Sequence, residues 1–239
     1  MNIAIIGYGK MGKTIEQIAT QRGHNIILKI SSSNLDELTA ENLKKADVAI
    51  EMTQPEAAKE NILLCLNTGV PVTSGTTGWN AEIPVAEQAA KDNNTSFLYA
   101  SNYSVGVNIF FEVNKLLAKL MNEQPNYEVS MTEIHHLQKK DSPSGTAITL
   151  ANQITNAIER KNKWSEEEKS DDTLFITALR EEGVFGTHSI KYHSEIDDID
   201  ITHTANNRKG FALGAVLAAE YIADKKGVFT MQDVLGINK

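Results

Sequence analysis

The sequence contains a single cysteine and lacks any long run of apolar residues. Cys65 can form neither a disulfide bond within the chain nor a multi-cysteine zinc site, and its apolar, helical-looking surroundings favour a buried structural thiol over a nucleophile. No segment holds the roughly 18 consecutive apolar residues of a membrane helix. The stretch from Asn2 to Gly9, before Lys10, lacks the basic region and cleavage site of a signal peptide. We therefore expect a cytoplasmic protein with no membrane partner.

Positive charge is also scarce. The 23 lysines and arginines stand against 31 aspartates and glutamates, which gives a formal net charge of -8 at pH 7. This balance argues against nucleic acid as a partner, and it requires a local cationic cluster wherever an anionic ligand binds. With 41% hydrophobic and 23% charged residues, the composition is that of a globular protein, without internal repeats or low-complexity tracts. The 239 residues suffice for one large or two modest domains at about 150 residues per domain.

The first hundred residues alternate between predicted strands and predicted helices. A strand at Asn2–Ile6 leads through a glycine turn into a helix with Ile15, Ile18 and Ala19 on one side, and a second strand at Asn25–Ile30 completes a βαβ unit. Further strands are predicted at 48–52, 70–73 and 96–99, with helices at 56–67 and 83–92. This alternation indicates an α/β fold with a doubly wound parallel sheet.

The pattern changes after Ser101. A predicted helix at 107–122 precedes a segment at 127–134 whose polar and apolar residues alternate, as in a sheet covered on one face only. A helix at 147–158 and strands at 175–180, 187–192 and 198–203 follow, and we interpret the charged segment 159–172 as a solvated loop or helix end. We thus predict a dinucleotide-binding domain at 1–103, a second, α+β domain at 104–210, and a C-terminal helical segment at 211–239 that returns to the first domain.

The turn after the first strand reads Gly7-Tyr8-Gly9-Lys10-Met11-Gly12. In such a loop the first glycine makes the turn, the second lets a pyrophosphate approach the backbone, and the third allows close packing of the helix. Within a βαβ unit this pattern predicts dinucleotide binding, although the same glycines could form a turn that binds nothing. The acidic residue expected about 20 residues later is replaced by Ser31, Ser32 and Ser33, with Lys29 the nearest upstream charge. Because no carboxylate there repels a 2′-phosphate, we expect NADPH to be accepted, alone or alongside NADH.

Two further segments follow predicted strands. Gly75-Thr76-Thr77-Gly78 could contact the nicotinamide end of the cofactor, or it could be a simple turn. Ala100-Ser101-Asn102-Tyr103-Ser104 closes the next strand. Both segments are expected at the carboxyl edge of the parallel sheet, where ligands of such folds bind.

The most concentrated cationic cluster comprises His135, His136, Lys139 and Lys140. It runs into Ser142-Pro143-Ser144-Gly145-Thr146, which resembles a helix N-terminus with free N–H groups and a positive dipole end. Together these groups could receive a small dicarboxylate. A metal site and a solvated patch are the alternatives, and the neighbouring lysines disfavour a metal. A reductase that takes hydride from a nicotinamide cofactor also needs a proton donor, and histidine or a lysine of lowered pKa suits that task.

These motifs resemble the dihydrodipicolinate reductase family. Further matching residues are Thr53-Gln54-Pro55-Glu56, Asn102 to Asn108, Glu133-Ile134, Asp141 to Ala147, Thr202 to Ala205, Arg208, Phe211-Ala212 and Gly214-Ala215. The resemblance implies a Rossmann-type N-terminal domain, and a C-terminal domain for substrate binding and oligomerisation. The open mixed sheet of that second domain would form the contacts of a homotetramer, and a hinge would close on the substrate.

The resemblance also implies a role for each matching position. His135 corresponds to the family's proton donor and acceptor, Lys139 to its catalytic lysine, and His136, Gly145 and Thr146 to its substrate contacts, with no metal. The implied cofactor contacts are Gly7, Tyr8, Gly9, Lys10, Met11, Gly12, Gly75, Thr76, Thr77, Ala100, Ser101, Asn102 and Tyr103. The implied reaction transfers hydride from NADPH or NADH to dihydrodipicolinate, a cyclic imine dicarboxylate, and protonates the resulting enamine to give tetrahydrodipicolinate for lysine and diaminopimelate biosynthesis.

Three features depart from the family pattern. The glycine loop is one residue shorter than the Gly-x-x-Gly-x-x-Gly form of many members, serines replace the acidic residue after the second strand, and the chain is slightly short. Two other classes remain open on the residues alone. A non-catalytic dinucleotide sensor would have no use for His135 and Lys139. A dehydrogenase of another small dicarboxylate, such as aspartate, is disfavoured by Pro143-Ser144-Gly145-Thr146 only through the resemblance.

Overall fold

The computed structural model describes residues 1–207 and 209–237, and within them the chain forms two compact units. The first unit contains Met1–Val105 and the chain from Lys209 onward. The second unit contains the described residues from Gly106 to Asn207. The boundaries predicted from the sequence fall after residues 103 and 210. Arg208, one of the residues that carry the family resemblance, lies outside the described residues.

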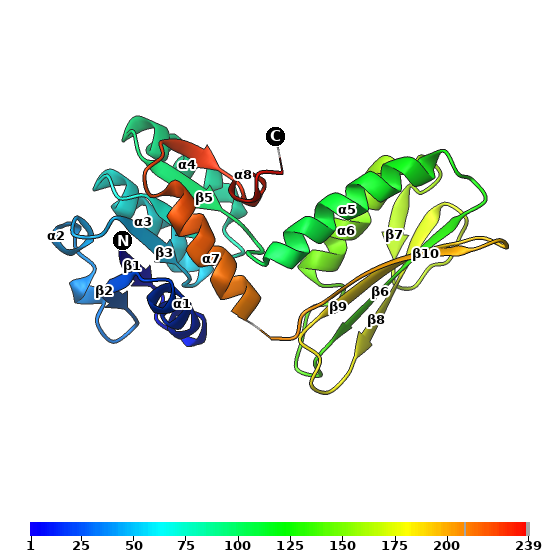
Figure 1. Cartoon of the computed structure of the whole chain (residues 1–239), viewed down its shortest axis with the longest axis horizontal. Helices are drawn as coiled ribbons and strands as arrows, with labels where there is room; N and C mark the ends of the chain where they lie inside the picture. Colours follow the sequence, from blue (N-terminus) through cyan, green and yellow to red (C-terminus); the bar gives the residue numbers. More distant parts are fainter. Residues whose placement is uncertain (208, 238–239) are drawn as a thin grey trace. The chain divides into compact units, whose positions relative to one another are not determined.

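The first unit is built on a six-stranded parallel sheet (Figure 1). Its strands follow the order β11-β5-β4-β3-β1-β2, and every neighbouring pair is parallel. This arrangement confirms the predicted doubly wound sheet. The strands are β1 (Asn2–Ile6), β2 (Asn25–Ile30), β3 (Val48–Glu51), β4 (Val72–Ser74), β5 (Ser96–Tyr99) and β11 (Gly227–Phe229).

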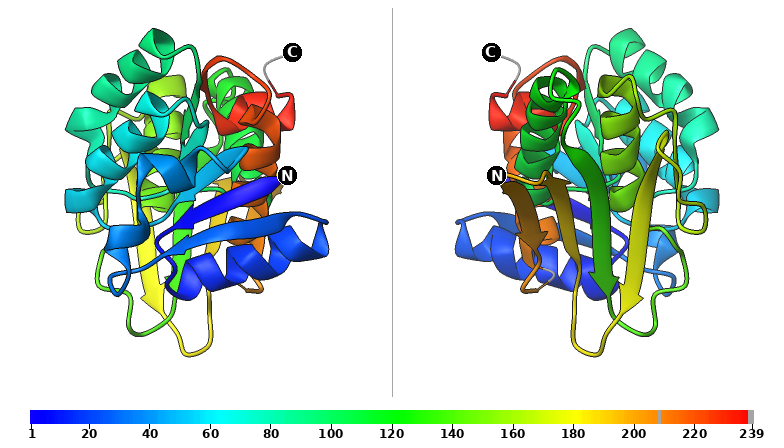
Figure 2. Two further views of the ribbon diagram at one scale, coloured as in Figure 1. Left: turned by 90° about the vertical axis from the view of Figure 1, so that its left-hand side faces the viewer. Right: turned by 90° about the vertical axis from the view of Figure 1, so that its right-hand side faces the viewer.

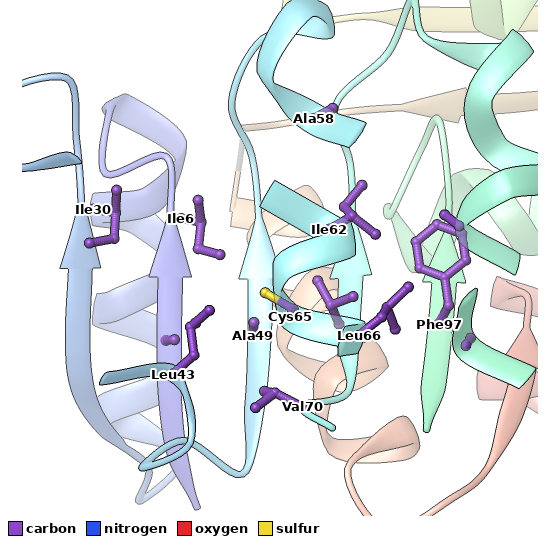
Figure 3. Packing of buried hydrophobic residues seen from close by; sticks show 14 of the residues in the cluster. Ile6, Ile30, Leu43, Ala49, Ala58, Ile62, Cys65, Leu66, Val70 and Phe97 are labelled. Atoms are coloured by element: carbon purple, nitrogen blue, oxygen red, sulfur yellow. The ribbon is translucent and has the colours of Figure 1, made fainter. Parts of the chain in front are cut away.

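Helices pack on both faces of this sheet because successive strand residues point to opposite sides. Along β1, Ala4 and Ile6 belong to one buried cluster, and Ile3 and Ile5 belong to another. Figure 3 shows the first cluster, in which the fully buried Cys65 packs among apolar side chains as a structural thiol. Its helices are α2 (Ala40–Leu43), α3 (Pro55–Asn67) and α4 (Ile83–Asp92), whereas α1 (Lys10–Gln21), α7 (Lys209–Ile222) and α8 (Met231–Leu235) supply residues to the second cluster.

The second unit contains a five-stranded mixed sheet in the order β10-β9-β6-β8-β7. Strand β6 pairs in parallel with β8 and antiparallel with β9, which confirms the mixed sheet. The helices of this unit cover one face of the sheet, and the described part of the unit places no helix on the other face (Figures 1 and 2). The elements are α5 (Val105–Asn122), β6 (Glu128–His135), α6 (Gly145–Ala157), β7 (Lys163–Ser165), β8 (Thr173–Arg180), β9 (Thr187–His193) and β10 (Asp198–Thr204).

The prediction that segment 159–172 is entirely solvated is wrong in two respects. Residues Lys163–Ser165 form the short edge strand β7, which pairs with β8. Lys161 is only 1% exposed, and its ammonium group donates hydrogen bonds to Glu128 and to the carbonyl groups of Asp171 and Thr173. The charge of a lysine hides this role in the sequence, because a lysine is buried only when tertiary structure supplies partners.

None of the helices within the described residues is long and apolar enough to cross a membrane.

Candidate active site

The glycine loop of the first unit has the geometry that its three glycines require. Gly7 has a φ of +101°, and a Cβ atom there would lie 2.1 Å from the carbonyl oxygen of Met52. A Cβ atom on Gly12 would lie 2.5 Å from the carbonyl oxygen of Gly7, whereas Gly9 has open space around it. The first and third glycines are therefore demanded by packing, and the second leaves the backbone open to a ligand.

Helix α1 begins directly after this loop. No side chain caps its N-terminus at Gly9, and its first turn contains no acidic residue. Its first N–H groups therefore present partial positive charge with no carboxylate nearby in sequence, which suits an anion such as a phosphate.

A cavity of about 640 Å³ adjoins the glycine loop and reaches the end of β2. Tyr8, Gly9, Ser31 and Ser32 line it, together with a segment that follows β3. The described lining includes the acidic Glu56 and no lysine or arginine.

Lys29, the cation nearest to the serines in sequence, is already paired. Its Nζ atom lies 2.5 Å from Oε1 of Glu16 and 5.4 Å from the centre of the Tyr8 ring. The serine hydroxyl groups also bond locally, since Oγ of Ser31 lies 2.8 Å from Oγ of Ser33. The end of β2 therefore carries neither the carboxylate typical of NADH sites nor an unpaired Lys29 for a 2′-phosphate.

The segments after β4 and β5 contain residues with different roles. A Cβ atom on Gly75 would lie 2.6 Å from Sδ of Met52, so a larger residue here would require the end of the Met52 side chain to move. Tyr103 is 3% exposed, and its hydroxyl group donates to the carbonyl oxygen of Ser74 at 2.7 Å. The side chain of Thr76 is buried, but that of Thr77 is exposed. The buried side chain of Tyr103 is thus closed to a cofactor, whereas the exposed side chain of Thr77 can contact one.

The sequence analysis missed Glu51, which organises this edge of the sheet. Its fully buried carboxylate accepts hydrogen bonds from the Thr53 N–H group, from Oγ of Ser74 at 2.6 Å and from Oγ1 of Thr76 at 2.9 Å. These bonds tie together the ends of β3 and β4. The signal available in the sequence was an acidic residue at the end of the apolar run of β3, two residues before the family motif that begins at Thr53.

In the second unit, His135 ends the central strand β6 beside a buried carboxylate. The Nδ1 atom of His135 lies 3.5 Å from Oε2 of Glu133, and Nε2 of His188 lies 3.6 Å from the same oxygen. Glu133 is fully buried, and His135 is 7% exposed. Arg180 approaches the other carboxylate oxygen, with Nη1 at 3.6 Å from Oε1.

The same carboxylate holds the start of helix α6. The N–H group of Ser144 donates to Oε1 and Oε2 of Glu133 at 3.1 and 3.2 Å. The Ser144 hydroxyl oxygen caps the helix by accepting a hydrogen bond from the Ala147 N–H group at 3.1 Å. The helix predicted from residue 147 therefore begins at Gly145. The space beside Gly145 is open, because a Cβ atom added there would have no neighbouring heavy atom within 4 Å.

Burial and charge shift the pKa values of this cluster strongly. Burial alone would raise the pKa of Glu133, but its interactions with His188 and Ser144 and the charge of His135 lower that pKa to about 2. Burial also lowers the pKa of His135 to about 4. The charge of Glu133 opposes this shift, and the positive charges of His188, Lys139 and Arg180 add to it.

The remaining predicted residues lie in the turn between β6 and α6. Lys139 donates to both carboxylate oxygens of Asp141 at 2.9 and 2.8 Å. This partner is the exposed member of the pair, with 61% of its side chain accessible against 19% for Lys139. Nδ1 of His136 is buried and has no hydrogen-bond partner among the described residues. Thr146 follows Gly145 in the first turn of α6.

Glu133, His135 and His188 also satisfy the spacing of a metal site, because one ligand atom of each lies within 4.8 Å of the others. Two features favour a network of hydrogen bonds and ion pairs over a metal. The Ser144 N–H group already uses both carboxylate oxygens, and the positive guanidinium group of Arg180 faces the same carboxylate. The expectation of a site without metal stays a prediction.

The fold and these two sites define a class. A parallel α/β unit with a glycine loop at a helix start, joined to a unit with a buried histidine and carboxylate, is the architecture of a two-domain oxidoreductase that uses a dinucleotide. Residues 1–103 match the family "Dihydrodipicolinate reductase, N-terminus", and residues 106–235 match "Dihydrodipicolinate reductase, C-terminus". The chain therefore belongs to the dihydrodipicolinate reductase family, which confirms the resemblance found in its motifs.

Individual relatives agree with this membership. The 4-hydroxy-tetrahydrodipicolinate reductase of Christiangramia forsetii is 51% identical over 237 residues, which cover 98% of each chain. The enzyme of the same name from Methanocaldococcus jannaschii is 34% identical over 98% of this chain and 82% of its own. The solved structure of dipicolinate-bound dihydrodipicolinate reductase from Paenisporosarcina sp. TG-14 has the same fold, with a TM-score of 0.81 and 22% identity over 98% of both chains.

Proposed function

We propose that the protein reduces dihydrodipicolinate to tetrahydrodipicolinate with NADPH or NADH, in the cytoplasm and within lysine and diaminopimelate biosynthesis. The observation that carries this proposal is the buried His135 beside Glu133, at the strand end from which the chain turns into the N-terminus of α6. That arrangement combines a proton donor with an anion receptor. Family membership and the 51% identical relative support the choice of substrate.

The first unit fits a dinucleotide. Its glycine loop leaves Gly9 open, the uncapped start of α1 suits the pyrophosphate, and the adjoining cavity has room for the adenosine part. Thr77 and the backbone of Ala100 to Tyr103 are the proposed contacts of the nicotinamide part. When bound, the nicotinamide supplies the hydride, and the protein's own residues orient the substrate and deliver the proton.

The second unit supplies the substrate contacts. The N–H groups of Gly145 and Thr146, at the positive end of α6, receive one carboxylate, and Lys139 and His136 receive the other. The exposed Asp141 carboxylate is the partner that a substrate carboxylate would replace at Lys139. The relative from Paenisporosarcina was solved with dipicolinate, and this supports a small cyclic dicarboxylate as the ligand class.

His135 is the proposed proton donor to the enamine. With a pKa of about 4 in the free protein, its ring is mostly neutral near pH 7. A bound dianion places negative charge close to the ring and raises its pKa, so substrate binding itself promotes uptake of the proton that is later delivered. Lys139 adds positive charge at the same edge, and this stabilises the carboxylate of the substrate.

An absorbance assay tests this function. Dihydrodipicolinate is generated in place by a coupled synthase from pyruvate and aspartate semialdehyde, and the loss of NADPH or NADH absorbance is followed. Because the described cavity lining holds neither lysine nor arginine, and Lys29 is paired, we expect both cofactors to be used with kcat/KM values within about tenfold. Absence of oxidation by a sample that binds NADPH in calorimetry would contradict the proposal and favour a sensor or a different dicarboxylate.

A further inference from the structure

Glu133 faces both the proton donor and the substrate-binding end of α6, yet no step of the proposed reaction uses it. We propose that Glu133, with His188 and Arg180, is a positioning unit that fixes the ring of His135 and the start of helix α6 in one arrangement. This inference rests on the proposed function, because it assigns His135 and α6 their roles in the reaction.

Strand register brings the unit together from three neighbouring strands. Glu133 and His135 are two residues apart on β6 and therefore point to the same face. In the antiparallel pair of β6 and β9, Glu133 lies opposite His188. In the parallel pair of β6 and β8, His135 lies beside Arg180. Because cross-strand neighbours interact directly, each flanking strand contributes one basic side chain to the buried carboxylate.

The carboxylate joins this sheet to helix α6 through Ser144. Both of its oxygens accept from the Ser144 N–H group, and the Ser144 hydroxyl group lies 3.1 Å from Nε2 of His188 while it caps the helix. Movement of Glu133 would therefore displace His188, Ser144 and the Gly145 N–H group together. The buried carboxylate of Glu133 thus sets the position of the N–H groups at the start of α6, which bind the substrate carboxylate.

The two nitrogen atoms of His135 have different surroundings. Nδ1 faces Glu133 at 3.5 Å, whereas a Cβ atom on Gly186 would lie 3.1 Å from Nε2. The rings of His135 and His188 meet edge to face, with centres 5.1 Å apart, which restrains rotation of the His135 ring. We expect Nδ1 of the neutral ring to hold the hydrogen that points at the carboxylate, and Nε2 to be the atom that takes up and gives the catalytic proton.

Among the described residues, Glu133 is the neighbour whose charge stabilises the protonated ring of His135. The groups that act on the ring are Glu133 on its own strand, His188 on β9, Arg180 on β8 and Lys139 in the following turn. Of these only Glu133 favours the protonated ring, and the other three oppose it. Removal of the Glu133 charge would leave the imidazolium without its counter-ion.

Glu133→Gln tests the inference, because the amide oxygen can still accept from Ser144 but carries no charge. We expect kcat to fall at least about tenfold near pH 7, because each unit by which the pKa of His135 decreases lowers the protonated fraction of the ring about tenfold. The part of the pH profile of kcat that reports the ionisation of His135 should move to lower pH. The affinity for NADPH, whose proposed site is in the first unit, should not change. Glu195→Gln is the matched control, since Glu195 is exposed in the turn between β9 and β10. An unchanged pH profile in Glu133→Gln would overturn the inference.

Nitrogen NMR gives a second readout, which is taken on the wild-type protein with Glu133 in place. Imidazole signals of His135, identified by their loss in His135→Gln, should show the neutral ring protonated at Nδ1 near pH 7. Protonation at Nε2 instead would contradict the role of Glu133. The two proposals remain distinguishable: absence of turnover by the wild-type protein would reject the proposed reaction, whereas turnover with the wrong tautomer would reject only the positioning unit.

Discussion

At the residue scale, the chemistry of the second unit depends on a few side chains whose properties come from their neighbours. Lys139 illustrates this, because its ammonium group is held by Asp141 at the surface although the proposed partner is a substrate carboxylate. Lys140, the next residue, is exposed and is not one of the implied substrate contacts. Replacing Lys139 or Lys140 removes the same charge from two neighbouring positions, so a difference between the two variants reports the position and not the charge.

We expect Lys139→Ala to weaken the binding of dipicolinate, used as a stable dicarboxylate probe, by about 10-fold to 100-fold. The reason is that a hydrogen bond between charged groups contributes about 1.5–3 kcal/mol. Titration calorimetry of the protein with NADPH present measures this affinity. Lys140→Ala is the control and should bind dipicolinate as the parent does. Equal losses in both variants would indicate a general charge effect and remove Lys139 from the site.

The ionisation of His135 and Glu133 also makes stability depend on pH. Both groups have a lower pKa in the folded protein than their ordinary values of 6.5 and 4.5, so the unfolded chain binds more protons as the pH falls. Their stabilising contribution is complete above about pH 6.5, and it is lost as the pH falls through 4 for His135 and through 2 for Glu133.

We therefore expect the Tm of the protein to decrease as the pH is lowered below 6.5, and differential scanning calorimetry measures it. In His135→Gln the decrease between pH 6.5 and 4.5 should be shallower, because one of the titrating groups is absent. A Tm profile of His135→Gln parallel to that of the parent over this range would show that His135 does not titrate as described.

At this scale the sequence identified the conspicuous groups and missed their partners. His135, Lys139 and Gly145 stand in one short motif, and their residue types alone suggest anion binding and proton transfer. Glu133 belongs to the same motif, but its role depends on His188 and Arg180, which lie far along the chain and meet it only through strand register. Glu51 was missed for the same reason, since Ser74 and Thr76 reach it across the sheet.

At the element scale, periodicity predicted the long helices and strands well and the short ones poorly. Helix α4 and strand β5 have the predicted bounds, because apolar spacing and flanking turns define them clearly. The strands β7 and β11 and the helix α2 were not predicted, and the helical segment predicted at 211–239 did not separate α8 from α7. The elements β7, β11, α2 and α8 are three to five residues long, too short to show a period, and they exist because neighbouring elements supply their partners.

The buried Lys161 is the clearest case of an element fixed by tertiary contacts. Its ammonium group donates hydrogen bonds to Glu128 on β6 and to the carbonyl groups of Asp171 and Thr173, where β8 begins. These bonds hold the residues that precede β7 against the sheet. Lys163, two residues later, forms an exposed pair with Glu168. The first lysine should matter for stability and the second should not, because a buried polar group left without a partner costs about 1–3 kcal/mol and an exposed pair contributes little.

We expect Lys161→Met to lower Tm by several degrees, since it removes the donor to the buried carbonyl group of Thr173 and to the partly buried carbonyl group of Asp171. Lys163→Met, the matched change at an exposed site, should leave Tm nearly unchanged. Thermal unfolding followed by circular dichroism compares the two. Similar Tm values for both variants would mean that the buried ammonium group does not hold this segment.

At the scale of the whole molecule, the uncovered face of the mixed sheet is the proposed contact of a homotetramer. Thr132 on β6 and Ser189 on β9 are register partners on the face opposite to the buried Met131 and Glu133. Their register partners on that face include the hydroxyl residues Thr177 on β8 and Thr202 on β10. A second sheet can cover such a face without large cavities, whereas a bulky charge at its centre cannot be covered.

We expect light scattering to give a mass four times the 26.3 kDa of one chain. Thr132→Arg, which places a charge in the middle of the uncovered face, should reduce the mass to that of a smaller assembly. Asn156→Arg adds the same charge to helix α6 on the covered side and serves as the control. A single-chain mass for the parent, or an unchanged mass for Thr132→Arg, would reject this contact.

The measurement that tests the central claim most directly compares turnover of the wild-type protein and His135→Gln in the dihydrodipicolinate assay, with NADPH affinity measured by calorimetry in both. The account requires kcat to fall by about 10²–10⁴-fold, the usual contribution of a general acid, while the Kd for NADPH stays the same. Turnover of His135→Gln within about twofold of the wild-type value would contradict the assignment of His135 as the proton donor.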